Sequence, residues 1–188
     1  MNWHCMKNRI SGSIPSSIGS LKKLKRLLVY SNQISGTIPF SFGTLTDLIE
    51  LDVHDNALMG HIPNSIGQMQ ALEKLDLSSN MLSGSIPSSV TNLTVISVLY
   101  MDTNYLEGTI PFPSRSGGMP SLGFLRLHNN HLSGNILPTF GYLVSLQRVS
   151  LSNNKLERAL PSSLGNLHSL TQLYLSDNSF SGQIPKSI

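Results

Sequence analysis

One asparagine recurs along the chain at an almost constant interval. Eight copies close a run of the form apolar-x-apolar-x-x-Asn, and the interval is 24 residues except for one of 26. A unit of this length cannot bury its apolar side chains alone and does so by stacking on its neighbours. The period therefore predicts a solenoid with a long repeated surface. The eight residues are Asn8, Asn32, Asn56, Asn80, Asn104, Asn130, Asn154 and Asn178.

Two apolar columns precede each asparagine. Position −5 runs from Trp3 to Leu173, and position −3 runs from Cys5 to Leu175. A spacing of two is the strand period, so both columns point to one face, while positions −6, −4 and −2 point to the other. Each repeat should contribute one short parallel strand with one buried face.

A second pattern, N-x-L-S-G-x-I-P, follows the asparagine and is cleanest at 32–39 and 80–87. Its two apolar positions point inward, and the glycine lets the backbone turn. The proline ends the extended segment and opens a short turn or 3-10 helix. The chain should therefore bend twice in each coil.

The asparagine amide offers two donors and one acceptor to backbone groups that would otherwise be buried unpaired. Replacing Asn80 by Leu should therefore destabilise the whole array. Ser78→Ala, on the outward face of the same strand, should be nearly silent.

The complete unit, L-x-x-L-x-x-L-x-L-x-x-N-x-L-S-G-x-I-P-x-x-L-G, covers essentially the whole chain. It resembles the plant-specific class of leucine-rich repeats, found in receptor kinase ectodomains, receptor-like proteins and polygalacturonase inhibitors. The resemblance implies an α/β solenoid of about eight 24-residue coils, with a parallel sheet on the concave face and short turns or 3-10 helices on the convex face. It also implies extracellular recognition of a protein, peptide or small ligand, whose identity the scaffold does not specify.

The period continues without a linker, so residues 1–188 should form a single leucine-rich repeat domain. Neither end carries a unit that would cover the last core layer, so the domain is expected to be truncated at both ends and to self-associate there. Whether such a fragment is natural or excised stays open. Cys5, the only cysteine, lies in an inward column and should be a core residue.

The chain has no apolar run long enough to span a membrane and no signal-peptide pattern. The resemblance nevertheless implies an extracellular or cell-surface location, in the apoplast, for the parent protein. Asn92 begins the sequon Asn92-Leu93-Thr94 on the turn after Pro87, where a glycan would project into solvent.

Three positions depart from the repeat. Arg158 replaces its glycine, and Leu137 takes the proline position, with Pro138 one residue late. The fifth coil carries two extra residues within 112–120, whose Pro/Gly/Ser composition predicts an irregular loop. Such loops often carry recognition, but a tolerated insertion on the convex side is the favoured interpretation.

Charge is unevenly distributed, although the net charge is only +3. Six of the thirteen basic residues lie in the first 26 positions, and six of the ten acidic residues lie between 47 and 76. Binding a nucleic-acid backbone needs a continuous basic stripe. Because residues 27–114 contain a single base, Lys74, nucleic acid is excluded as the expected partner.

The strand alternation identifies the outward residues of the sheet. Seven steps between adjacent strands give a groove roughly 34 Å long, which suits an extended peptide or a protein edge. Its middle combines aromatic, arginine and charged side chains, as interaction hot spots do. The predicted contacts to a protein or peptide ligand, or to a co-receptor, are Tyr30, Asp52, His54, Asp55, Asp76, Tyr100, Asp102, Arg126 and His128. The alternative is a solvated sheet face without a partner.

Catalysis and metal binding are not expected. His54, Ser78 and Asp102 share a column, but the serine lies in the middle, whereas a triad needs the histidine there. No His/Cys group has ligand spacing. Asp52, Asp55 and Asp76 around His54 could hold a cation, but a negative patch on an open sheet is the favoured interpretation. No cofactor is expected.

Two functions of different classes remain. The first is a non-catalytic recognition module of a plant cell-surface receptor-like protein. The second is a soluble inhibitor of a cell-wall hydrolase, resembling polygalacturonase inhibitors. The receptor is favoured, because the cap cysteines usual in the inhibitors are absent.

Overall fold

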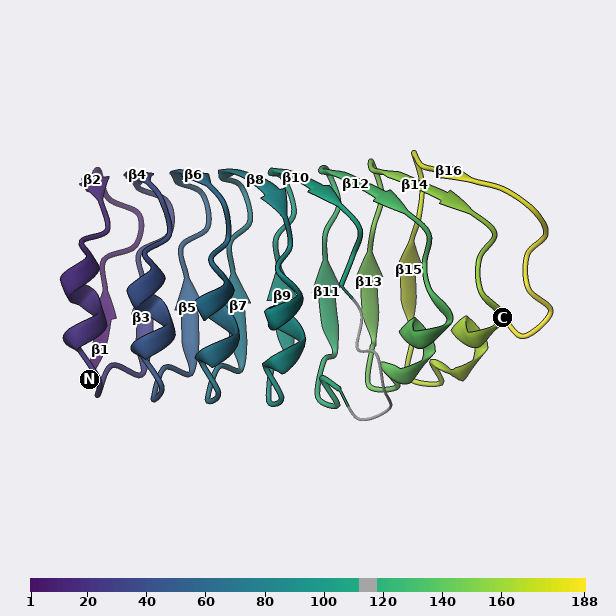
Figure 1. The fold of residues 1–188 in the computed structure, drawn as a ribbon, viewed down its shortest axis with the longest axis horizontal. Helices are drawn as coiled ribbons and strands as arrows, with labels where there is room; N and C mark the ends of the chain where they lie inside the picture. The colour runs from purple at the N-terminus through teal and green to yellow at the C-terminus, as the bar shows by residue number, and fades with distance from the viewer. Residues whose placement is uncertain (112–117) are drawn as a thin grey trace.

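The computed structural model describes residues 1–111 and 118–188, which form a stack of parallel coils running from one end of the molecule to the other (Figure 1). Each coil contributes one strand to a first parallel sheet, and every strand covers positions −6 to −4 relative to its asparagine. The predicted leucine-rich repeat solenoid is thus confirmed. In the described residues the first sheet consists of β1 (Asn2–His4), β3 (Arg26–Leu28), β5 (Glu50–Asp52), β7 (Lys74–Asp76), β9 (Val98–Tyr100), β11 (Phe124–Arg126), β13 (Arg148–Ser150) and β15 (Gln172–Tyr174).

A second parallel sheet runs along the stack and was not predicted. Its strands begin one or more residues after each asparagine, where the sequence is rich in Ser and Gly and has no strand-like alternation. Backbone pairing between coils creates these strands, since the regular stack brings identical segments into register. They are β2 (Ser11–Ser13), β4 (Gln33–Gly36), β6 (Ala57–Gly60), β8 (Met81–Ser85), β10 (Tyr105–Gly108), β12 (His131–Gly134), β14 (Lys155–Arg158) and β16 (Ser179–Phe180).

Short 3-10 helices follow the proline position, as predicted. Most begin directly after the proline, whose backbone is extended. η5 begins at Pro138, with Leu137 in the capping position, so the late proline does not shift the helix. In the described residues the helices are η1 (Ser16–Ser20), η2 (Phe40–Thr44), η3 (Asn64–Gln68), η4 (Ser88–Asn92), η5 (Pro138–Tyr142) and η6 (Ser162–Asn166).

The insertion of the fifth coil lies mostly outside the described residues, because 112–117 are not described. Met119 is buried in the core and is 3% exposed. None of the helices in 1–111 and 118–188 has the length and apolar content needed to cross a bilayer.

The core is one continuous column of apolar side chains from Ile18 to Leu167. In the last coil, Leu173 and Leu175 are only partly buried, and Cys5 has the same status in the first coil. Cys5 packs against the core, as predicted, and accepts a hydrogen bond from Nε1 of Trp3 at 3.1 Å.

The asparagines form a ladder that links each coil to the one before it. Nδ2 of Asn80 donates to the carbonyls of Val53, Leu77 and Ser78 at 3.1–3.2 Å. Its Oδ1 accepts from the Leu58 amide at 3.0 Å. This is the backbone-satisfying role that the sequence predicts for the repeated asparagine.

Ser78, by contrast, is not a neutral surface position. It is only 7% exposed, and both its amide and its Oγ donate to Oδ1 of Asp76, at 3.1 and 2.6 Å. The prediction that Ser78→Ala is nearly silent is therefore wrong, because the substitution removes a donor from a buried carboxylate.

Candidate functional site

The register of the first sheet places the predicted residues side by side on its outward face, called here the first-sheet face. Leu28, Asp52 and Asp76 are paired across β3, β5 and β7. The row continues through Tyr100 and Arg126 across β9 and β11. The shared face predicted from strand alternation is present, and its residues form two clusters.

The first cluster is centred on Asp52, His54 and Asp76, called here the His–Asp cluster. Nδ1 of His54 lies 2.6 Å from Oδ1 of Asp52 and 3.9 Å from Oδ2 of Asp76. The His54 ring is stacked on Tyr30, with centroids 4.5 Å apart and planes within 13°. The stacking partner and Asp52 together fix the orientation of the imidazole.

Lys74 belongs to the same cluster and was not among the predicted site residues. Its Nζ lies 2.9 Å from Oδ2 of Asp52 and 3.2 Å from Oε1 of Glu50. Burial lowers the pKa of Lys74, but the hydrogen bonds and charges of Asp52 and Glu50 outweigh it and raise the pKa above 10.5. Position −6 has the same parity as −4 and −2, so strand alternation alone could have identified this lysine.

Asp76 lies on the other side of the imidazole. Burial raises the pKa of Asp76 above its usual 3.8. The Ser78 donors oppose this increase and the charge of Asp52 adds to it. Its carboxyl group thus has two neutral donors and no lysine or arginine partner within the described residues.

The second cluster joins Tyr100, Asp102, Arg126 and His128. The Arg126 guanidinium lies 3.2 Å from Oδ1 of Asp102 and 4.8 Å from the centre of the Tyr100 ring. Nε2 of His128 lies 3.4 Å from Oδ2 of Asp102. Burial lowers the pKa of His128 below its usual 6.5; Asp102 acts in the opposite sense, and Arg126 adds to the decrease.

The acidic residues of the two clusters are more buried than an open polar face implies. Asp52, Asp76 and Asp102 are 3%, 7% and 3% exposed, because neighbouring side chains of the same face cover them. Asp55 differs, since it is exposed on the loop after β5, with a φ of 53°, and has no ion pair in the described chain. The groups available for direct contact in the middle coils are therefore mainly Tyr30, His54, Tyr100 and Arg126.

A hollow of about 320 Å³ lies on the first-sheet face over the last four coils. It adds Arg148 and Tyr174 to the predicted residues. Tyr174 is 49% exposed, and Arg148 has no ion pair among the described residues. The sequence interpretation placed the chemically richest part in the middle coils and missed this extension. The lining consists of Tyr100, Arg126, His128, Arg148, Ser150, Ser152, Gln172 and Tyr174.

The residues considered for a catalytic triad have separate partners. His54 contacts Asp52, Ser78 donates to Asp76, and Asp102 is paired with Arg126. The histidine therefore does not join this serine to this aspartate, as a triad requires.

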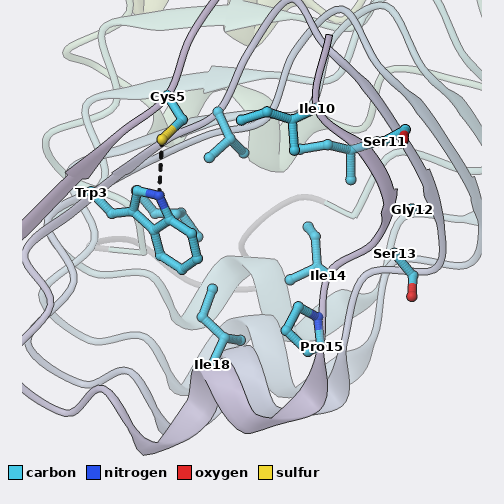
Figure 2. A pocket seen from close by; sticks show the side chains of 12 residues that line it. Trp3, Cys5, Ile10, Ser11, Gly12, Ser13, Ile14, Pro15 and Ile18 are labelled. Carbon is cyan, nitrogen blue, oxygen red and sulfur yellow. Dashed lines mark hydrogen bonds between the residues drawn. The ribbon is translucent and has the colours of Figure 1, made fainter. Parts of the chain in front are cut away.

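An apolar pocket opens at the first coil, where Figure 2 shows Trp3, Cys5, Ile10, Ile14 and Ile18 around it. These side chains belong to the inward columns that continue as the core in the following coils. The pocket is thus an extension of the core, and its lining carries few polar groups.

Comparison with protein families assigns the chain to a class. The model of the leucine-rich repeat region matches residues 55–187, and a second leucine-rich repeat model matches 22–82. The chain belongs to the leucine-rich repeat family. A comparison with curated protein sequences gives no match.

Solved structures with the same fold include plant receptors. The GASSHO1/SCHENGEN3 receptor kinase ectodomain from Arabidopsis thaliana, in complex with CASPARIAN STRIP INTEGRITY FACTOR 2, is 36% identical with a TM-score of 0.92, over 96% of this chain and 21% of that one. A TDR receptor is 35% identical with a TM-score of 0.93, over 99% and 32%. The Arabidopsis HAESA ectodomain with an IDA peptide hormone ligand is 33% identical with a TM-score of 0.90, over 98% and 31%. The chain thus spans a fifth to a third of these receptor chains.

Proposed function

We propose that the chain is a non-catalytic recognition module that binds an extended peptide on its first-sheet face, as part of a plant cell-surface receptor-like protein. The supporting observation is the row of aromatic and charged side chains from Tyr30 to Tyr174, hollowed over the last four coils. The similar HAESA and GASSHO1/SCHENGEN3 ectodomains are described in complex with a peptide hormone and an integrity factor.

The contacts proposed for this ligand are the predicted residues together with Arg148 and Tyr174. The half-buried ring of Tyr100 and the exposed ring of Tyr174 supply apolar contact area with low loss of side-chain entropy. Arg148 supplies an unpaired cation, so the hollow suits an acidic or carboxylate group of the peptide. The buried carboxylates of Asp52 and Asp102 mainly position His54 and Arg126.

The wider setting is also proposed. A HAESA structure contains both the IDA hormone and the co-receptor SERK1, which supports a co-receptor as a second partner. The receptor likeness supports an extracellular or cell-surface location and a single recognition domain over 1–188. Asn92 and Thr94 of the sequon are exposed, which supports a glycan at Asn92. The inhibitor alternative has no specific observation in its favour.

A displayed library of secreted plant peptides, selected on the purified chain, tests this function. Enriched peptides are expected to lose at least tenfold in affinity for the Arg148→Ser/Tyr174→Ser double variant, because both side chains are exposed and line the hollow. The matched control is Phe40→Ser, which changes an aromatic residue that is 68% exposed on η2. Enriched peptides that bind the double variant as tightly as the wild type would contradict the proposal.

A further inference from the structure

The His–Asp cluster has the composition and spacing of a metal site. One ligand atom from each of Asp52, His54 and Asp76 lies within 4.8 Å of the other two. Asp52 and Asp76 are paired residues of the adjacent strands β5 and β7, and His54 follows Asp52 by two residues, so the backbone fixes their separation. Ligands about 2.1 Å from a tetrahedral ion lie about 3.4 Å from each other. The distances from Nδ1 of His54 to Oδ1 of Asp52 and to Oδ2 of Asp76, 2.6 and 3.9 Å, lie on either side of that value.

In Asp52 and Asp76, the carboxylate oxygen that does not face the His54 imidazole accepts a hydrogen bond from another residue. Lys74 contacts Oδ2 of Asp52 at 2.9 Å, leaving Oδ1 directed at the imidazole. Ser78 uses both of its donors on Oδ1 of Asp76, which leaves Oδ2 of Asp76 directed at the same imidazole. Outer partners of this kind orient metal ligands in proteins.

A buried carboxylate without a lysine or arginine partner, whose Oδ2 has only the His54 ring beside it at 3.9 Å, points to a ligand at this place. The Asp76 side chain is 10% exposed, and its Oδ2 accepts no hydrogen bond from any described residue. Aspartate is almost never buried to this extent unless it is paired. Lys74 is shared by Glu50 and Asp52, and Arg26 lies 3.6 Å from Glu50. Among the buried aspartates Asp52, Asp76 and Asp102, Asp76 is thus the one for which the described chain supplies no lysine or arginine.

We propose that Asp52, His54 and Asp76 bind a divalent zinc-like ion on the first-sheet face. The mixed donor set selects the metal, because imidazole with carboxylates suits Zn²⁺, whereas Ca²⁺ takes six to eight oxygen ligands. His54 is 31% exposed in its side chain, so the remaining coordination position faces solvent. A water molecule or a donor atom of a bound partner completes the coordination.

Titration calorimetry of the full chain with zinc alone, at pH 7 in a buffer free of chelators, tests the site. One zinc ion per chain is expected, and His54→Gln and Asp76→Asn should each lower the affinity at least tenfold. Ser78→Ala should lower it by up to about tenfold by releasing Asp76. Calcium should not bind at this site.

His131→Gln is the matched control, since this histidine is exposed on β12, away from the cluster. It should leave the stoichiometry and affinity unchanged. Thermal melts of all variants establish that they are folded, and zinc should raise the melting temperature of the wild type but not of His54→Gln. Absent or non-stoichiometric binding, or equal affinity in wild type, His54→Gln and Asp76→Asn, would overturn the site. No peptide is involved, so this result is independent of the proposed recognition function.

Discussion

At the scale of single residues, buried polar side chains determine how the coils are joined. Each ladder asparagine inside the stack bonds both to its own coil and to the preceding one, as Asn80 does with Leu77 and Val53. The clusters on the first-sheet face follow the same rule, because Asp52 and Asp102 are tolerated in buried positions through Lys74 and Arg126. Substitutions at such positions should lower the stability of the fold by more than their location on the surface implies.

Asn80→Leu is expected to destabilise the chain by about 3 kcal/mol or more, because the Leu58 amide and several carbonyls lose a buried partner. Denaturant unfolding followed by circular dichroism measures the effect. Ser176→Ala is the control, since Ser176 is exposed in the column that contains Ser78, and it should change the stability by less than about 0.5 kcal/mol. Equal losses in the two variants would refute the ladder interpretation.

His128 should make the chain sensitive to mild acid. Its pKa in the folded state is lowered below 6.5, so the unfolded chain takes up the proton first as the pH falls. The contribution of His128 to the stability of the fold is fully present above pH 6.5. It is lost as the pH falls through the pKa that His128 has in the folded state. His128→Gln should therefore show a smaller decrease in melting temperature between pH 7.5 and about 5.5. An unchanged decrease would argue against a half-buried imidazole that is kept neutral.

At the scale of elements, the first sheet and the 3-10 helices were predictable, and the second sheet was not. Apolar residues spaced by two, such as Leu51 and Val53, specify strands such as β5 directly, because burial of one face enforces the alternation. In β4 or β8 only one apolar residue points inward, so the strand arises from contact with the adjacent coil. For the site, the −4 and −2 columns gave most of the residues. Lys74 and Arg148 were missed because the −6 column was not followed.

Arg158 replaces a repeated glycine and adopts a left-handed φ of 69°. This conformation is unfavourable for a residue with a Cβ, and its ion pair with Glu157 is exposed and 4.0 Å long. Arg158→Gly should therefore stabilise the chain by about 0.5 kcal/mol, whereas the neighbouring Glu157→Gly should destabilise it by about 1 kcal/mol. Melting temperatures of both variants provide the measurement, and a loss of stability in Arg158→Gly would contradict the strain argument.

The 3-10 helices pack closely from coil to coil. A Cβ at Gly67 would lie 2.2 Å from the Ser89 carbonyl oxygen in the next coil, whereas a Cβ at Gly123 would have its nearest neighbours at 3.8 Å. Gly67→Ala should thus lower the free energy of unfolding by about 2 kcal/mol, whereas Gly123→Ala should change it little. Chemical denaturation of the two variants distinguishes them. Similar stabilities would mean that the helix layer is not closely packed.

At the scale of the whole molecule, the stack converts a local repeat into an extended surface. The inward columns and the asparagine ladder form the rigid part, so the outward residues of adjacent coils are held in fixed rows. Ligand chemistry then depends on which side chains occupy those rows, here an acidic stretch followed by an aromatic and cationic hollow. The fold follows from the period, while the ligand depends on the few outward positions that the period leaves variable.

The most direct test of this account is a crystal structure of the chain with a peptide enriched by selection. We expect the peptide to lie extended along the first-sheet face, crossing β5 to β13, with an acidic group in the hollow beside Arg148 and Tyr174. A peptide bound instead to the second sheet or to the 3-10 helices would contradict the central claim that the outward face of the first sheet is the recognition surface.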